Sequence, residues 1–325
     1  MVDAGLALLI SPLLGFGLAM LMMFIFKKVV KKKRFFREPD PNKKPPFWIR
    51  SILVLTCTSV SYFHGSNDGQ KGVGLIMIIL ISLAPAYFAL DKSKSISNMY
   101  GNIHAIESYT NKMNVNALSA EHQKKLAAIK LEVAEIRAEI EKSEVKDEIK
   151  AENRLKVRND IVLMSKSYET ILKANKDDAA IGLTEREYKG LTKNIKALKE
   201  FTEYAPWPVI LMVSMALGLG TMIGWKRIVV TIGEKIGKSH LSYAQGASAE
   251  IVASSTIGLS SVLGLPVSTT HVLSSGIAGT MVSQGGLKNL QQKTIKNILI
   301  AWVITIPVTV ILSCGIFLGL YYLLG

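Results

Sequence analysis

Polar and charged side chains interrupt an apolar stretch early in the chain, and their types could do chemistry there. Residues 61–72 read SYFHGSNDGQKG, between SILVLTCTSV and VGLIMIILISLA. A charge at bilayer depth costs roughly 2.5–3.5 kcal/mol on insertion scales, so Asp68 and Lys71 need a functional reason to be there. The glycines around them weaken a helix. The pattern predicts a broken transmembrane helix whose freed backbone groups line a cavity; a loop between two short spans is the alternative.

A second interruption lies in residues 244–283, which are rich in Gly, Ala and Ser. Small residues recur four positions apart, as at Ser275 and Gly279, which favours close helix packing in a membrane. Pro266 followed by hydroxyl residues is typical of a helix start, with Ser268 or Thr269 as the N-cap. We expect two half-length helices that meet near the bilayer midplane, in a re-entrant hairpin with its tip at Pro266.

The two interruptions offer complementary ligands. A helix N-terminus presents free N–H groups and a positive dipole end, and the hydroxyls of Ser268, Thr269 and Thr270 add donors. Together these groups favour a small oxyanion. Asn67 and Asp68 offer amide and carboxylate oxygens, which suit a small cation or a proton. The combination describes a symporter in which the cation offsets the charge of the anion.

Glu250 lies among small residues and has two open interpretations. It is either a further proton- or cation-coupling group or a structural carboxyl held by hydrogen bonds. No nucleophile pattern accompanies His64 or His271, and the sequence has no ATP-binding glycine loop. We therefore predict no enzyme activity, no cofactor and no metal site.

Apolar runs must position these residues. A run of about 20 apolar residues crosses a hydrocarbon core of about 30 Å. The runs are residues 6–26, 49–60, 73–90, 208–225 and 298–324. The sequence thus predicts an all-α, multi-pass integral membrane protein. The first run has no basic segment before it and is too long for a signal peptide, so it is read as a retained helix. Cys57 and Cys314 lie within apolar runs and indicate no disulfide framework.

The formal charge of +14 is unevenly distributed. Residues 91–203 hold 21 basic and 19 acidic side chains, a difference of +2, so +12 lies elsewhere. Much of it lies on 27–50 and 226–238, short segments beside apolar runs, which is the positive-inside signal for the cytoplasmic side. Segment 50–90 must then cross an odd number of times, with 91–203 outside. The first basic cluster could also bind anionic lipid. Nucleic acid is not expected, because no basic face is interleaved with aromatic residues.

Residues 91–203 differ in composition from the rest of the chain. Apolar residues spaced 3, 4, 3 and 4 apart within an Ala/Glu/Lys-rich sequence predict a helix. They are Leu126, Ile129, Val133, Ile136 and Ile140. We expect a helical hairpin packed on itself, and a docking surface for another subunit is the alternative. His104 and His122 are predicted to be surface residues.

These observations predict five regions along the chain. They are a transmembrane helix (1–26), a basic cytoplasmic linker (27–49), a broken transmembrane segment with the Asn-Asp motif (50–90), a helical extramembrane insertion (91–203) and a transmembrane bundle with the re-entrant hairpin around Pro266 (204–325).

The two interrupted segments resemble a known family. HGSNDGQKGVGLIMIIL and LPVSTTHVLSSGIAGTMV are similar to the second-half signatures of the inorganic phosphate transporter (Pit) family, close to the bacterial low-affinity phosphate permeases. The resemblance covers nearly everything except 91–203. It implies phosphate transport coupled to sodium or protons, with metal–phosphate complexes carried by some members. It also implies an inverted repeat with phosphate and cation sites where the two halves meet.

The chain departs from that family pattern, because it has no earlier Asn-Asp motif and no earlier hairpin. The family's other version of the Asn-Asp motif has small residues at the positions that Gln70 and Lys71 occupy here. The chain thus resembles the C-terminal half of a transporter, one half of an inverted repeat. The predicted phosphate-binding residues are Ser268, Thr269, Thr270 and Asn67, and the predicted cation-coupling residues are Asp68, Asn67 and Glu250.

The partners this implies are inorganic phosphate, free or as a metal complex, a proton or sodium ion, the lipid bilayer of the cell inner (plasma) membrane, and an N-terminal half or an oligomer partner. Two alternatives remain open. One is a transporter of another oxyanion such as sulfate, and the other is a non-transporting membrane anchor that displays 91–203.

Overall fold

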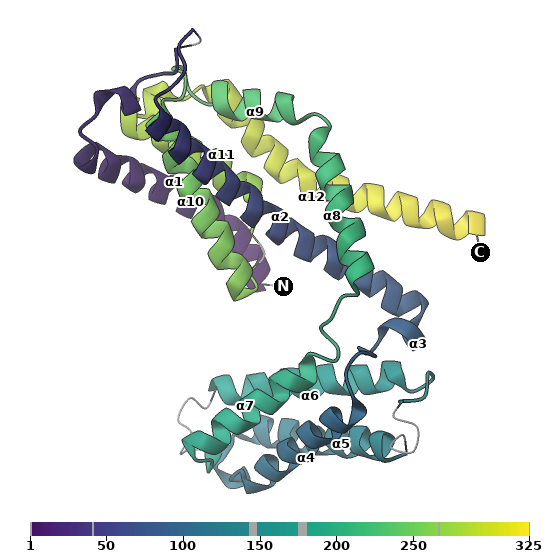
Figure 1. Cartoon of the computed structure of the whole chain (residues 1–325). Coiled ribbons are helices and arrows are strands. Elements are labelled where there is room, and N and C mark those ends of the chain that lie inside the picture. Colours follow the sequence, from purple (N-terminus) through teal and green to yellow (C-terminus); the bar gives the residue numbers. More distant parts are fainter. Residues whose placement is uncertain (1, 41, 143–147, 175–180, 266, 325) are drawn as a thin grey trace. The chain divides into compact units, whose positions relative to one another are not determined.

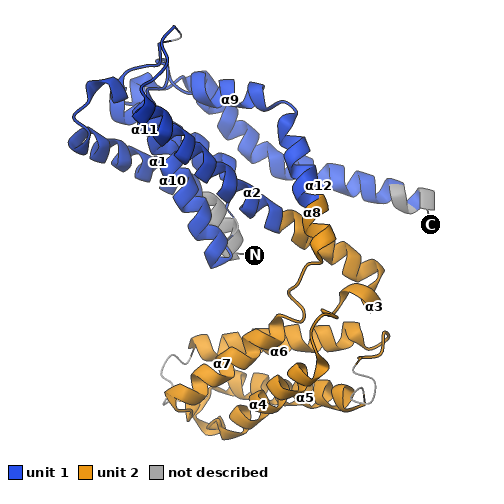
Figure 2. Cartoon of the chain, viewed as in Figure 1, with its two compact units in different colours: residues 1–70, 213–325 blue, residues 71–212 orange. Residues whose placement is uncertain are grey.

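The computed structural model is helical in all its named elements and divides into two compact units (Figures 1 and 2). It describes residues 2–40, 42–142, 148–174, 181–265 and 267–324. Unit 1 comprises residues 1–70 with 213–325, and unit 2 comprises residues 71–212. Segments far apart in the sequence therefore build unit 1, whereas unit 2 is one continuous stretch.

The helices of unit 1 are long, as the apolar runs predict. They are α1 (Val2–Val29), the first part of α2 (Phe47–Leu83), the end of α8 (Trp207–Met222), α9 (Trp225–Glu234), α10 (Tyr243–Leu263), α11 (Thr269–Gly285) and α12 (Gln292–Leu324). Among the described residues, Ile10–Val29 and Gln292–Gly319 are long and apolar enough to cross a membrane. The pair α8 and α9, bent by 62°, makes a third candidate if it is one span.

Small residues bring the central helices of unit 1 close together. A Cβ atom at Gly279 of α11 would lie 2.2 Å from the backbone oxygen of Phe16 in α1, and one at Gly15 would lie 2.5 Å from Oγ of Ser275. Only glycine permits such an approach. The two helices run in the same direction, since Gly15 lies at Ser275 and the Lys27 ammonium donates to the carbonyl of Ser283 at 2.7 Å.

The prediction of a break in the first polar segment was wrong. Helix α2 runs without interruption through all of SYFHGSNDGQKG, and at 37 residues it is about 55 Å long. Two features support the helix there. His64 and Asp68 pair one turn apart. The ring of Phe63 packs closely on Gly258 of α10, where an added Cβ atom would lie 2.8 Å from the ring.

The second polar segment does form a helical hairpin, although its helices are longer than predicted. Helix α10 ends at Gly264, whose positive φ of 68° suits glycine, and α11 begins after the N-cap Ser268. The Ser268 cap agrees with the sequence prediction, while the predicted tip, Pro266, lies outside the described residues. With 21 and 17 residues, α10 and α11 are about 31 and 25 Å long, so the predicted half-length helices were wrong.

Unit 2 holds a four-helix bundle in place of the simpler hairpin that we expected. Its helices are α4 (Ile96–Lys112), α5 (Ala120–Glu141), α6 (Arg154–Ala174) and α7 (Glu185–Lys199), preceded by the short α3 (Pro85–Phe88). All five periodic apolar residues of α5 are buried in one shared core, which confirms the helical spacing. His104 is exposed and His122 is half-buried.

Candidate functional site

The Asn-Asp motif of α2 contacts the hairpin through Asn67. The Asn67 amide nitrogen donates to Oγ of Ser261 in α10 at 3.0 Å, and Ser261 in turn donates to the carbonyl of Ile257 at 3.0 Å. Asn67 is only 3% exposed, and its side-chain oxygen has no hydrogen-bond partner among the described residues. A buried, unpaired carbonyl oxygen is unusual and marks a place where a cation or a donor could bind.

Asp68 lies beside this asparagine and is paired within its own helix. His64 Nε2 lies 2.9 Å from Oδ2 of Asp68, one helical turn away, and both side chains are partly exposed. The i, i+4 spacing places the two side chains on one face of α2. The His64 imidazole thus contacts the carboxylate of Asp68, which the sequence analysis predicts to be a cation-coupling group.

Glu250 makes a second polar contact between α10 and α2. The hydroxyl of Thr56 in α2 donates to the Glu250 carboxylate, and Glu250 is half-buried. The same sequence offset of 194 residues separates Thr56 from Glu250 and Asn67 from Ser261, so α2 and α10 run in the same direction and in register. This contact holds the carboxylate and fits either interpretation of Glu250.

The N-terminus of α11 carries the predicted phosphate ligands. Ser268 Oγ accepts the backbone N–H of His271 at 3.4 Å, Thr269 is buried and Thr270 is exposed. The ring of His271 packs on Trp302 of α12, with centroids 4.1 Å apart. The hydroxyls and the first turn of a 17-residue helix are thus held at the end of the hairpin turn.

The predicted residues are only partly brought together. Asn67 reaches α10 one turn before the hairpin turn, whereas among the described residues it makes no hydrogen bond to Ser268, Thr269 or Thr270. Both groups of predicted site residues lie in unit 1, without a direct hydrogen bond from Asn67 to the predicted anion ligands among the described residues.

Sequence reasoning missed three partner residues. Thr56, Ser261 and Trp302 hold Glu250, Asn67 and His271, and each acts from a helix distant in the sequence. No local signal marks them. The His64–Asp68 pair, by contrast, could have been found from its i, i+4 spacing.

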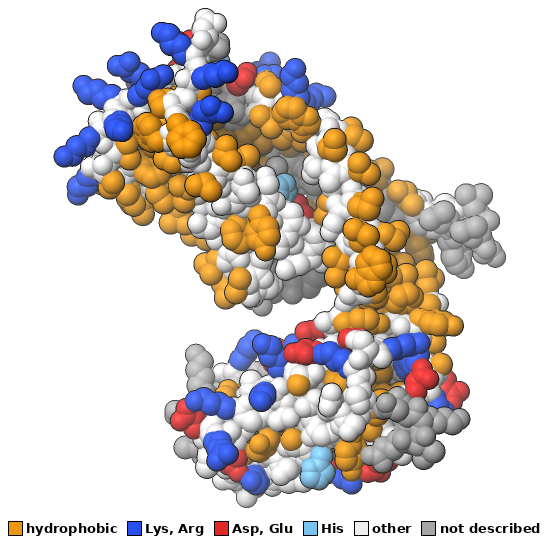
Figure 3. Space-filling view, viewed as in Figure 1, with side chains coloured by type: hydrophobic (Ala, Val, Ile, Leu, Met, Phe, Trp, Pro, Cys, Tyr) orange, Lys and Arg blue, Asp and Glu red, His pale blue; other side chains and the backbone are white. Residues whose placement is uncertain are grey.

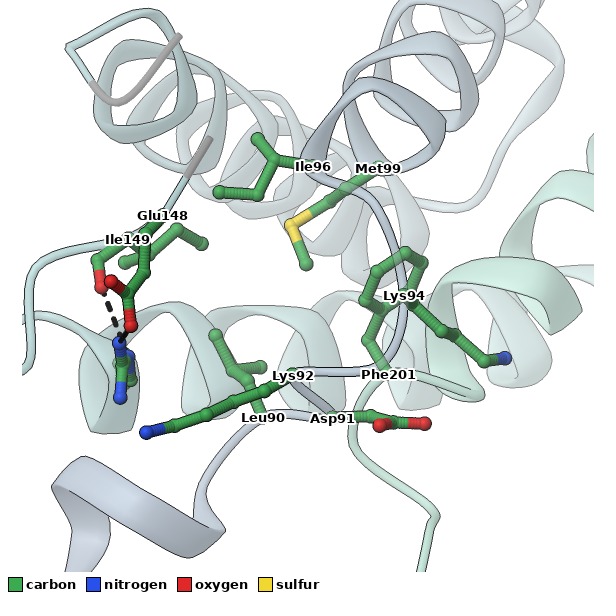
Figure 4. Close-up of a pocket in the computed structure, with 10 residues that line it drawn as sticks. Leu90, Asp91, Lys92, Lys94, Ile96, Met99, Glu148, Ile149 and Phe201 are labelled. Atoms are coloured by element: carbon green, nitrogen blue, oxygen red, sulfur yellow. Dashed lines mark hydrogen bonds and ion pairs between the residues drawn. The ribbon is translucent and has the colours of Figure 1, made fainter. Parts of the chain in front are cut away.

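A separate cavity of about 330 Å³ lies in unit 2 and contains none of the predicted site residues (Figure 4). Glu148 and Ile149 line one side, and Lys94 and Phe201 the other. Its cations are already engaged. Arg154 bonds the carbonyl of Ile149 at 2.9 Å and the carboxylate of Glu148, and Lys94 pairs with Glu200 at 2.6 Å. The ammonium of Lys92 lies 4.7 Å from the centre of the Tyr87 ring. The cavity is therefore a poor anion site.

Comparison with known proteins identifies the family. The family model described as the phosphate transporter family matches residues 1–313. The chain belongs to this family. Among curated proteins, it is 37% identical over 343 residues to a low-affinity inorganic phosphate transporter of Buchnera aphidicola from Acyrthosiphon pisum, covering 96% of this chain and 67% of that protein.

A second curated relative agrees with this membership. The low-affinity inorganic phosphate transporter PitA of Escherichia coli K12 is 36% identical over 343 residues, with the same coverage of 96% and 67%. The chain thus spans about two thirds of the length of these relatives. The solved structure of a sodium-dependent phosphate transporter matches with a TM-score of 0.31 and 17% identity, covering 100% of this chain and 91% of that one. The resemblance predicted from the two motifs is confirmed.

Proposed function

We propose that this chain contributes to cation-coupled symport of inorganic phosphate, with a proton or sodium ion as the coupled cation. The observation that supports this most directly is the contact of Asn67 with Ser261. It joins the Asn-Asp motif to the hairpin helix and leaves a buried amide oxygen without a partner. Leaving such a group unpaired costs about 1–3 kcal/mol, which a bound cation or a substrate hydroxyl would recover.

The phosphate half-site is proposed at the start of α11. The free N–H groups of the first turn and the hydroxyls of Ser268, Thr269 and Thr270 favour an oxyanion without any fixed cationic side chain. None of these three residues is a lysine or an arginine. The negative charge of bound phosphate would therefore remain for a coupled cation to offset.

The cation half-site is proposed at Asn67 and Asp68. Both present oxygen ligands, which small hard cations prefer, and the imidazole of His64 offers Asp68 a proton partner. Glu250 is proposed as an additional coupling carboxyl, held by Thr56. A cation bound at these oxygens would make binding of phosphate at the start of α11 less unfavourable.

A complete site is proposed to need a second protein part. The chain carries one Asn-Asp motif and one hairpin, whereas the resemblance implies a pair of each. We infer that a separate N-terminal half supplies the remaining ligands, since two copies of this chain inserted the same way would not reproduce an inverted repeat. The relatives are named as low-affinity inorganic phosphate transporters, and this name is the basis for choosing phosphate over other oxyanions.

The membrane orientation is part of the same proposal. With 27–50 and 226–238 cytoplasmic in the inner membrane, the bundle of unit 2 lies on the opposite, periplasmic side. In a chain with Cys57 and Cys314 replaced by serine, a cysteine at Lys130 of the bundle should react with a membrane-impermeant maleimide in intact cells with a permeabilised outer membrane. Labelling only after inner-membrane lysis would contradict this orientation.

Uptake of labelled phosphate tests the function. The chain is expressed alone, and together with a separately encoded first half, in cells that lack their own phosphate transporters. We expect uptake only on co-expression. In that setting Asn67→Ala should abolish uptake, whereas Asn98→Ala, the same change at an exposed position of the bundle, should leave it unchanged. Full uptake by the Asn67→Ala variant would contradict the proposed site.

A second substitution separates the anion site from the cation site. Thr269→Val keeps the size of the side chain and removes one donor, which should cost about 1–3 kcal/mol, or roughly 5- to 150-fold in apparent phosphate affinity. Thr305→Val is the matched control, since among the described residues the Thr305 hydroxyl bonds only the carbonyl of Ala301 in its own helix. Competition by sulfate as strong as by phosphate would indicate a less selective oxyanion transporter.

A further inference from the structure

The basic segments of unit 1 gather at one end of it, although they are far apart in the sequence (Figure 3). Lys27, at the end of α1, bonds the carbonyl of Ser283, near the end of α11. The 3-10 turn Lys33–Phe36 packs through Phe35 against the start of α10 at Ala244. The backbone N–H of Lys238, after α9, bonds the carbonyl of Asn289. The ends of α1 and α11 and the starts of α2 and α10 therefore form one basic end.

Most cations of the linker at this end have no carboxylate partner. Among the described residues, no ion pair involves the following five exposed side chains: Lys28, Lys31, Lys33, Arg34 and Arg37. Lys43 pairs with Asp40 at 3.7 Å, and Lys27 is held by Ser283. The bundle of unit 2 is different, because its lysines and arginines are repeatedly paired, as Lys112 is with Glu187 and Arg137 with Glu107. The basic end thus presents uncompensated positive charge.

Aromatic and apolar side chains surround these cations. Phe35 is buried and packs edge-on against Phe26, with ring centroids 5.5 Å apart. Its ring also packs in a tilted geometry on Trp48, with the same centroid distance of 5.5 Å. The ammonium of Lys32 lies 5.2 Å from the centre of the Trp48 ring. Phe47, at the start of α2, is 83% exposed. Aromatic rings between an apolar span and a basic rim are the usual arrangement at a membrane–water interface.

Helix α9 extends the same arrangement. It leaves α8 at a 62° bend and exposes Trp225, Ile228 and Val229 on one stripe, each more than half exposed. Lys226 and Arg227 lie between them in the sequence and occupy another face of the helix. An apolar stripe opposite a basic face is the pattern of a helix that lies in the interface plane.

We propose that this basic end is a binding surface for the phosphate head groups of anionic phospholipids. Exposed apolar side chains adjoin the unpaired cations, so the surface fits a ligand that offers both acyl chains and negative charge. A bilayer leaflet rich in anionic lipid has this chemistry, whereas a soluble nucleic acid or an acidic protein supplies only the charge. The proposal does not depend on phosphate transport.

The test uses the full chain in vesicles with Trp48 as the only tryptophan, the other three being replaced by phenylalanine. Brominated lipids quench tryptophan fluorescence on contact. The quenching of Trp48 at equal fractions of the two lipids gives their relative affinity for the basic end. We expect this affinity to be about fivefold higher for brominated phosphatidylglycerol than for brominated phosphatidylcholine, which corresponds to one cation–head-group contact. Equal quenching by the two lipids would overturn the proposal.

Two matched variants make the test specific. Replacing the five unpaired cations named above by glutamine should remove the preference for phosphatidylglycerol. Replacing five exposed lysines of the bundle by glutamine removes the same charge elsewhere and should retain it: Lys124, Lys130, Lys166, Lys173 and Lys193. A preference that persists in the linker variant, or that excess inorganic phosphate abolishes in the unmodified chain, would contradict lipid binding at this surface. Gel filtration of each variant in detergent confirms that it is folded.

Discussion

The two units of this chain differ in the side chains that lie between their packed helices. In the bundle of unit 2, large aliphatic residues such as Ile103, Ile129 and Ile161 are fully buried, whereas the described charged residues other than Arg154 are at least partly exposed. In unit 1, alanine, serine and glycine fill the contacts between α1, α10 and α11, while large residues such as Val262 and Val303 are 84% and 74% exposed. The chain therefore holds one core built for water and one built for lipid.

The difference follows from the surrounding solvent. In water, removing large apolar surface from contact is the main driving force for packing. In a bilayer the lipid tails are as apolar as leucine, so helices associate through close backbone approach and polar contacts. The hydrogen bonds agree with this view. Gln245, fully buried in α10, donates to the carbonyl of Thr280 in α11 at 3.3 Å, whereas the polar contacts of the bundle are mostly surface ion pairs.

The largest effect should come from placing a large residue in the lipid-type core. Gly279→Leu puts a side chain where a Cβ would lie 2.2 Å from the Phe16 carbonyl, so α1 and α11 must separate. We expect unit 1 to lose its packing, seen as loss of a monodisperse peak in detergent gel filtration. Gly17→Leu is the control, because nothing lies within 4 Å of its Cβ position. Equal behaviour of the two variants would show that the close approach is not required.

The converse change, a smaller residue in the water-type core, should have a moderate effect. Ile161→Ala removes a fully buried side chain of the bundle and should lower its free energy of unfolding by about 2–5 kcal/mol. Leu163→Ala, at a position 53% exposed, should change it by no more than about 0.5 kcal/mol. Hydrogen exchange of bundle peptides in the full chain measures both. A similar loss for the two variants would contradict the assigned core.

The same contrast explains which features could be predicted from the sequence. The five buried residues of α5 were predicted correctly, because a stripe of apolar residues stands out in a polar background. The N-cap Ser268 also follows from a local rule. In unit 1 the apolar residues cover every face of α12, and no stripe marks the side that packs.

Other features depend on contacts between distant segments and could not be predicted. Glycines and charges lower helix propensity by up to about 1 kcal/mol each, which favoured a break in α2. The structure keeps the helix because Phe63 and Asn67 pack on α10 and His64 pairs with Asp68. The partners Thr56 and Ser261 carry no motif of their own, so only the fold identifies them.

The smallest effect, and the one that sharpens the comparison, concerns a carboxylate in the water-type bundle. Burial raises the pKa of Glu132, and the nearby carboxylates of Asp160 and Glu135 raise it further. Glu135 is compensated by Lys156 at 2.8 Å, whereas one buried oxygen of Glu132 makes no hydrogen bond among the described residues. The charged form of Glu132 therefore opposes folding. This destabilising contribution is fully present above the pKa of Glu132 in the folded chain, and it disappears as the pH falls below the ordinary value of 4.5.

Glu132→Gln should consequently stabilise the bundle at pH 7, because it removes the charge and keeps the shape of the side chain. The gain should shrink as the pH falls and vanish below about pH 4.5, where the glutamate is protonated in both folded and unfolded chains. Hydrogen exchange of bundle peptides at several pH values measures this difference, with Glu152→Gln at an exposed position as the control. A Glu132→Gln variant that is destabilised at pH 7, or whose gain does not depend on pH, would show that this carboxylate contributes through contacts rather than through its charge.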